Sequence, residues 1–177
     1  MDLSLFGLAY GAARSWNVAT EVEKVASAAD FLIYRNAGTF HILYALNIVE
    51  QTVHYGEFAW MYNNLYYPGK FNVADRKAAA LLASRNQCLD ICKKLDCQIW
   101  ERDHFRQEIM IAAEGVAVMA EMMMKLYGYE VSRITDTESW LKKYRSNWLI
   151  KNKESELSEI EKMFSFVEDG IAQGFVL

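Results

Sequence analysis

The feature that most limits how this chain can fold is a stripe of apolar residues between Asp103 and Leu126. Its members recur at alternating spacings of four and three residues: Phe105, Ile109, Ala112, Val116, Met119, Met123 and Leu126. This spacing places all of them on one face of an α-helix. Charged residues fall on the opposite face: Arg106, Glu108, Glu114 and Lys125. We therefore expect a central bundle helix over 103–126, ended by Gly128.

The rest of the chain also has the pattern of helices. The 177 residues contain a single proline, and proline breaks helices, so long helices are favoured. We expect helices to begin at four places. Thr20 and Glu23 form a capping box, and the pair Gly38-Thr39 precedes a helix from Phe40 to about Met61. Asn72 caps the next helix, and Asp136 or Thr137 caps a later one. A turn is expected at 66–70, and the last helix runs through 157–171. The sequence thus predicts an all-α fold, a bundle of about six helices.

Composition and charge exclude some classes of partner. Hydrophobic residues make up 53% of the chain, which is typical of a packed globular protein. The net charge is −4, and no basic patch stands out, so neither nucleic acid nor an anionic membrane is expected as a partner. The uncharged run from Ala37 to Val49 is too short to span a membrane. Asp2 stands where a signal peptide would carry a basic residue, so we expect a cytoplasmic protein.

The three cysteines favour packing over metal binding. Cys88, Cys92 and Cys97 are an odd number, and small buried thiols are typical of a reducing compartment. A zinc site needs a fourth ligand, for which His104 is the nearby candidate, but the spacing fits no zinc pattern.

A di-iron site in a helical bundle needs two Glu-x-x-His motifs. Glu101 and His104 form one such motif, whereas His41 and His54 have no glutamate three residues before them. We therefore predict no metal site and no cofactor.

Segment 55–71 is dense in aromatic residues, which suit core or interface packing and also stack on sugar rings. Packing is the commoner role. The residues that we regard as possible interface or sugar contacts are Tyr10, Trp16, Trp60, Tyr66 and Tyr67.

The stretch from Tyr144 to Leu157 has the pattern of a joint between two helices. Trp140, Tyr144 and Trp148 are spaced by four residues, and we expect Trp148 to attach the last two helices to the bundle. Arg145 can reach carbonyls or a carboxylate across the break. Asn152 and Ser155 can accept hydrogen bonds from free N–H groups at the start of the final helix.

This joint also resembles a known family. The pattern Arg-x-x-Trp-Leu-x-x-Asn-x-x-Ser-x-Leu is carried by Arg145, Trp148, Leu149, Asn152, Ser155 and Leu157. It resembles the closing signature of a helical domain that follows the catalytic barrel in one branch of the glycoside hydrolase family 20 β-N-acetylhexosaminidases. The first segment resembles the final helix of that (β/α)₈ barrel, through Leu8, Ala9, Tyr10, Ala12, Trp16 and Asn17. The resemblance divides the chain into 1–17, the last helix of a truncated barrel, and 18–177, a C-terminal α-helical domain.

The resemblance implies a hydrolase whose chemistry lies elsewhere. Family enzymes remove terminal N-acetylhexosamine with an adjacent Asp-Glu pair and the substrate's own acetamido group. Here only the reversed Glu168-Asp169 occurs, at a helix end. We therefore assign no catalytic residue and expect the chain alone to be inactive. The implied partners are the enzyme's own catalytic barrel and a second copy, as a homodimer.

A second hypothesis comes from another functional class. The same helices would suit a stand-alone protein-interaction module with no enzyme attached. A barrel with an Asp-Glu pair encoded upstream of Met1 favours the first hypothesis, and an in-frame stop codon there favours the second.

Overall fold

Every regular element in the described part of the chain is helical, which confirms the all-α prediction. The computed structural model describes residues 5–50, 53, 62–63 and 78–176. The elements are α1 (Leu5–Trp16), α2 (Val22–Ala29), the π-helical turn η2 (Asp30–Tyr34), α3 (Thr39–Glu50), α5 (Ala78–Asp96), α6 (Asp103–Leu126), α7 (Thr137–Lys151), the 3₁₀ turn η3 (Glu154–Glu156) and α8 (Leu157–Ala172).

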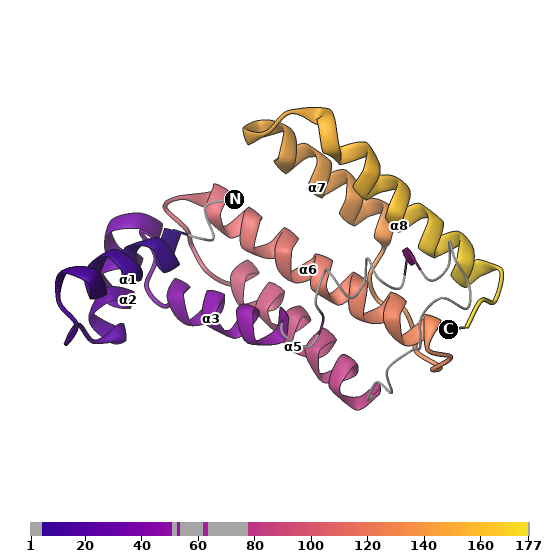
Figure 1. The fold of residues 1–177 in the computed structure, drawn as a ribbon, viewed down its shortest axis with the longest axis horizontal. Coiled ribbons are helices and arrows are strands. Elements are labelled where there is room, and N and C mark those ends of the chain that lie inside the picture. The colour runs from indigo at the N-terminus through magenta and orange to yellow at the C-terminus, as the bar shows by residue number, and fades with distance from the viewer. Residues whose placement is uncertain (1–4, 51–52, 54–61, 64–77, 177) are drawn as a thin grey trace.

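Helix α6 is the centre of the bundle (Figure 1). α5 has the most extensive contact with α6, and α3, α7 and α8 contact it as well. α7 and α8 form a hairpin on one side of α6, and α1 and α2 lie together at one end of the molecule. The core therefore lies around α6, and the N-terminal helices are peripheral to it.

The bounds predicted for α6 are confirmed at both ends. Gly128 follows the helix with a φ of 76°. The N–H of Gly128 donates to the carbonyl of Lys125, and that of Tyr129 donates to the carbonyl of Met124, each over 2.9 Å. These two bonds form a Schellman motif, which needs the positive φ that glycine adopts at little cost.

One charged residue of α6 lies in an unexpected place. Glu108 was expected on the polar face, but its side chain is only 1% exposed and forms an ion pair with Lys151 at the end of α7. The prediction was wrong because α7 covers that face of α6. A heptad pattern marks the most apolar face of a helix and does not show how many neighbours surround it.

The N-terminal signals of the other helices were predicted with mixed success. α3 begins at Thr39 after Gly38, as predicted, and Asp136 caps α7 by accepting a hydrogen bond from the N–H of Glu138. The capping box at α2 was wrong. Glu21 is the N-cap without a side-chain bond, and the Thr20 hydroxyl donates back to the carbonyl of Ala13.

Asp30 has a role that the sequence pattern did not indicate. Its carboxylate accepts hydrogen bonds from the N–H groups of Gly38 (2.7 Å) and Phe40 (2.8 Å) and so binds the free donors at the start of α3. The Asn72 cap, the turn at 66–70 and the predicted end of the helix near Met61 lie outside the described residues.

Candidate interaction surface and the helix joint

Large apolar side chains are exposed in the segment from α1 to η2. We call them the N-terminal apolar surface: Leu8, Trp16, Val18, Val22, Phe31 and Leu32. Trp16 is 95% exposed, and Phe31 is 67% exposed. Exposed apolar side chains that form a contiguous patch mark interaction sites.

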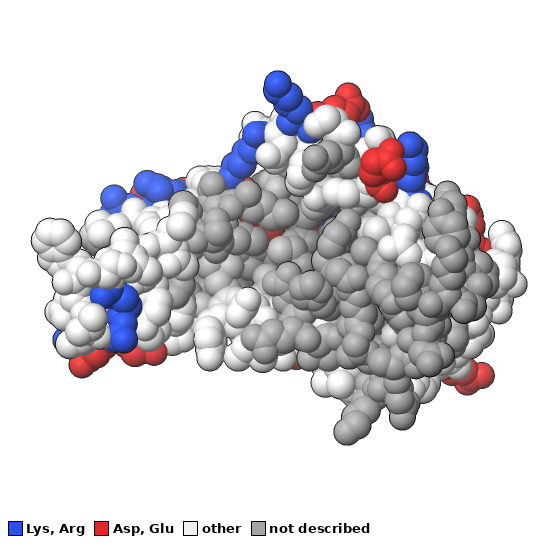
Figure 2. All heavy atoms as spheres, in the orientation of Figure 1, with Lys and Arg blue, Asp and Glu red and all other residues white. Residues whose placement is uncertain are grey.

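The same end of the molecule is poor in charge. Eight of the 50 residues from 1 to 50 are charged (16%), against 29 of the 100 residues from 78 to 177 (29%). In Figure 2 the end formed by α1 and α2 is mostly white, with a small number of charged side chains. Desolvating this surface against a partner therefore costs little electrostatic free energy.

The glycines of helix α1 are not covered by the other parts of the chain that the structure describes. A Cβ atom added at Gly7 or Gly11 would meet no atom within 4 Å. α1 packs on α2, and Tyr10 is half-buried. The glycines therefore offer a surface on which the backbone of another helix can approach closely.

The joint between α7 and α8 is held by charged and polar contacts. Arg145 donates to both carboxylate oxygens of Glu161 on α8, at 3.0 and 3.1 Å, and also to Glu154 in η3. This confirms that Arg145 reaches carboxylates across the break. The Glu161 and Glu154 carboxylates raise the pKa of the Arg145 guanidinium above its usual value.

The tryptophan that attaches this hairpin to the bundle is Trp140, not Trp148. Trp140 is 7% exposed, and its indole N–H donates to the carbonyl of Ile111 over 2.8 Å. It fits a notch at Gly115, where an added Cβ would lie 2.6 Å from the indole ring. Trp148 is only half-buried, and its indole N–H donates to the carbonyl of Lys153 at the joint itself.

The remaining motif residues shape the chain at the joint. Asn152 donates from its amide to the carbonyl of Trp148 and ends α7, so its expected cap of the final helix was wrong. Ser155 lies within η3, and Leu149 is exposed. Leu157 begins α8 and is fully buried.

A buried charged network in the bundle was missed from the sequence. Glu121 on α6 is fully buried and accepts hydrogen bonds from the N–H groups of Ile134 and Thr135 and from the Thr135 hydroxyl. The guanidinium groups of Arg85 and Arg133 lie 3.6 and 3.8 Å from its carboxylate.

Arg133 extends this network to α8. It donates to Glu168 and to the hydroxyl of Thr137, which in turn donates to Glu168. This network of ion pairs and hydrogen bonds thereby connects α5, α6, α7, α8 and the loop before α7.

The cysteines have the properties of packed thiols. Burial raises the pKa of Cys88 to about 12, with a smaller contribution from Cys92. Burial, Glu114 and Asp96 raise the pKa of Cys92 to about 12. Thiols of this kind are poor nucleophiles at neutral pH. Cys97 is exposed.

No metal centre is formed by the described residues, among which no group of three or more histidine, cysteine or acidic side chains is placed to hold an ion. His104 is exposed in the first turn of α6, and its ring lies 4.2 Å from that of Phe105. Trp60, Tyr66 and Tyr67 lie outside the described residues, and Tyr62 packs edge-on against Phe166 of α8.

Comparison with known proteins identifies no relative. No protein family, no curated protein and no solved structure matches this chain. Among the described helices, none combines the length and the apolar character needed to cross a membrane.

Proposed function

We propose that this chain is a non-catalytic helical domain that packs on the catalytic barrel of a glycoside hydrolase family 20 β-N-acetylhexosaminidase. In this proposal the barrel removes terminal N-acetylhexosamine in the cytoplasm, and the helical domain supports the barrel and the enzyme's homodimer. The observation that carries the proposal is the N-terminal apolar surface, which lies outside the packed core around α6.

The open side of α1 supports this proposal. Its exposed glycines allow close approach of another backbone, and Leu8 and Trp16 extend apolar area beside them. A helix with these properties suits the edge of a barrel, where neighbouring helices pack closely. Helix α6 itself needs no such partner, because most of its apolar residues are already buried.

The geometry of the joint supports a structural role for the motif residues. Arg145 and Trp148 bind groups of η3, α8 and the intervening chain. Such contacts set the angle between two helices and require no substrate.

A hydrolysis assay tests the absence of chemistry. We expect the purified chain to release no aryl alcohol from an aryl N-acetylglucosaminide at any pH at which it is folded. Measurable turnover that co-purifies with the chain would place catalytic groups within it and contradict the proposal.

A binding experiment tests the docking surface. The barrel encoded upstream of Met1 is co-expressed with the chain, and the yield of the complex is measured. We expect Trp16→Ser and Phe31→Ser to lower that yield, whereas Ile134→Ser, at a side chain 63% exposed in the loop before α7, leaves it unchanged. Absence of such a barrel from the gene, or equal yields for all variants, would favour the stand-alone interaction module.

A further inference from the structure

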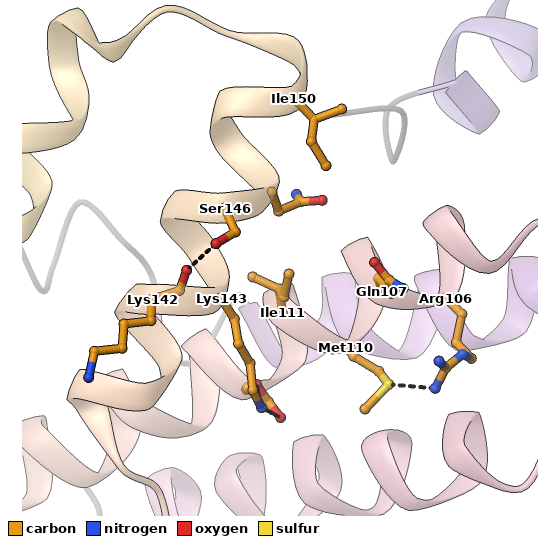
Figure 3. Close-up of a pocket in the computed structure, with 10 residues that line it drawn as sticks. Arg106, Gln107, Met110, Ile111, Lys142, Lys143, Ser146 and Ile150 are labelled. Atoms are coloured by element: carbon orange, nitrogen blue, oxygen red, sulfur yellow. Dashed lines mark hydrogen bonds and ion pairs between the residues drawn. The ribbon is translucent and has the colours of Figure 1, made fainter.

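A groove of about 500 Å³ lies between α6 and α7 (Figure 3). The two helices are held together at one end by Trp140 in its notch at Gly115 and at the other by the ion pair of Lys151 with Glu108. The groove lies in the interval between these contacts. Its volume is within the range of small-molecule sites.

Apolar side chains from both helices line the middle of the groove. Met110 and Ile111 come from α6, and Ile150 faces them from α7 (Figure 3). Ile150 is 74% exposed. A hydrocarbon body lying here would remove these side chains from water, which is favourable at about 25 cal/mol per Å².

Arg106 stands at the end of this apolar strip with hydrogen-bonding capacity left over. Its Nε donates to Asp103 over 2.6 Å, and its Nη1 lies 3.3 Å from the Asp96 carboxylate. The same Nη1 lies 3.3 Å from the Met110 sulfur (Figure 3). Its Nη2 has no acceptor among the described residues. Thioether sulfur is a weak acceptor, so an oxyanion would be a better partner for this edge of the guanidinium.

A second polar group in the groove is also without a partner. The half-buried Asn147 amide makes no hydrogen bond to any described residue. Lys143, by contrast, is already paired with Glu114 through contacts of 2.8 and 3.0 Å. Gln107, Lys142 and Ser146, which also line the groove, each make one hydrogen bond. The Nη2 of Arg106 and the Asn147 amide make none to the described residues.

The surrounding acids restrict the charge of a ligand. Asp96 and Asp103 pair with Arg106, and Glu114 pairs with Lys143, so these acids offset the cations of the groove. They would repel a polyanion more strongly than a single carboxylate, whereas a cation would meet Arg106. We propose that this groove binds a small amphipathic monocarboxylate. Its hydrocarbon body lies over Met110, Ile111 and Ile150, and its carboxylate accepts hydrogen bonds from Arg106.

Octanoate is a suitable probe, and octan-1-ol is the matched uncharged compound. Titration into the chain, followed by calorimetry and by amide chemical shifts, should give one saturable site for octanoate with shifts confined to α6 and α7. Arg106→Gln should weaken binding by roughly tenfold or more, since a charge-assisted hydrogen bond is lost. Octan-1-ol should bind more weakly by a similar factor. Lys162→Gln on the exposed face of α8 is the matched control and should bind as the native chain does.

A second variant keeps the test decisive if Arg106→Gln disturbs the fold. Ile150→Asp changes an exposed side chain and places a negative charge at the mouth of the groove, so it should abolish octanoate binding. The proposal is overturned if octanoate shows no saturable site, if octan-1-ol binds equally well, or if folded Ile150→Asp binds octanoate like the native chain.

Discussion

The segment from α1 to η2 and the bundle of α5 to α8 are both helical, but they differ in how much of their side chains is buried. The bundle buries most of α6, including the acidic residues Glu108 and Glu121. The N-terminal segment buries little and exposes Trp16 and Phe31. Burial in three dimensions distinguishes two regions that helical patterning alone treats alike. Stability should therefore reside in the bundle, and recognition in the N-terminal segment.

Charge is used differently as well. In the bundle, buried carboxylates are compensated by arginine and lysine side chains from neighbouring elements. In the N-terminal segment, the buried carboxylate of Asp30 is compensated by backbone N–H groups. The buried carboxylates of the bundle thus have partners distant in sequence, whereas that of Asp30 has nearby backbone donors.

The largest effect is expected at the centre of the bundle. Glu121→Ala removes the buried carboxylate that faces Arg85, while Arg133 keeps its ion pair with Glu168. The loss should lower the free energy of unfolding by about 3–5 kcal/mol. Urea unfolding followed by circular dichroism measures this. Glu159→Ala, at a side chain 73% exposed, is the control and should change little. Equal effects of the two substitutions would mean that the network does not stabilise the bundle.

The two tryptophans of α7 provide the next test. Trp140→Ala should lower the free energy of unfolding by about 3–5 kcal/mol, as for other buried aromatic residues. Trp148→Ala loses one hydrogen bond at the joint and should cost only about 1 kcal/mol. A reversed order in thermal or urea unfolding would show that Trp148 is the attachment point after all.

These two tests concern features that the sequence predicted unequally. The regular 3–4 spacing of Phe105 to Leu126 was enough to place α6, because local periodicity determines which face of a helix is buried. Which of the two tryptophans eight residues apart is buried depends on the notch at Gly115, a contact 25 residues from Trp140 in sequence. The Glu121 network has the same origin, since its partners come from α5 and the loop before α7.

The caps show the same limit at short range. Thr20 has a suitable partner at Glu23, but its hydroxyl bonds to Ala13 because the end of α1 folds back beside it. The groove between α6 and α7 gave no sequence signal, since Arg106 and Asn147 belong to ordinary polar faces. Its free hydrogen-bonding groups become visible only when the two helices are placed together.

Alkaline pH should weaken the bundle through Cys88 and Cys92. Their pKa of about 12 lies above the ordinary value of 9.0, so the unfolded chain loses these protons first. The stability that they contribute is complete below pH 9.0 and is lost as the pH rises towards 12, at about 1.4 kcal/mol per pH unit for each thiol. Urea midpoints from pH 8 to 11 should therefore fall less steeply for Cys88→Ala than for the native chain. Cys97→Ala should keep the native slope, and a reduced slope for this variant would contradict the assignment.

Glycine-to-alanine substitutions in α6 and α1 compare how tightly the two regions are packed. Gly115→Ala forces a methyl group against Trp140 and should destabilise the chain by about 1–3 kcal/mol. Gly11→Ala, in the open face of α1, should stabilise it by up to about 1 kcal/mol through helix propensity. The melting temperatures of the two variants should move in opposite directions. Movement in the same direction would mean that α1 is packed as tightly as α6.

The smallest effect on stability is expected at the N-terminal apolar surface. Trp16→Ser changes a solvent-exposed side chain and should alter the free energy of unfolding by no more than about 0.5 kcal/mol. It should also reduce any self-association seen by sedimentation. A large loss of stability would show that Trp16 packs within the chain and does not await a partner.

Native-state hydrogen exchange of the isolated chain tests the difference between the two regions most directly. Amides of α6 from Phe105 to Leu126 should exchange only through global unfolding, and those of α1 should exchange by local opening at a much lower free energy. Equal protection of α1 and α6 would contradict the division into a self-sufficient bundle and an N-terminal docking surface.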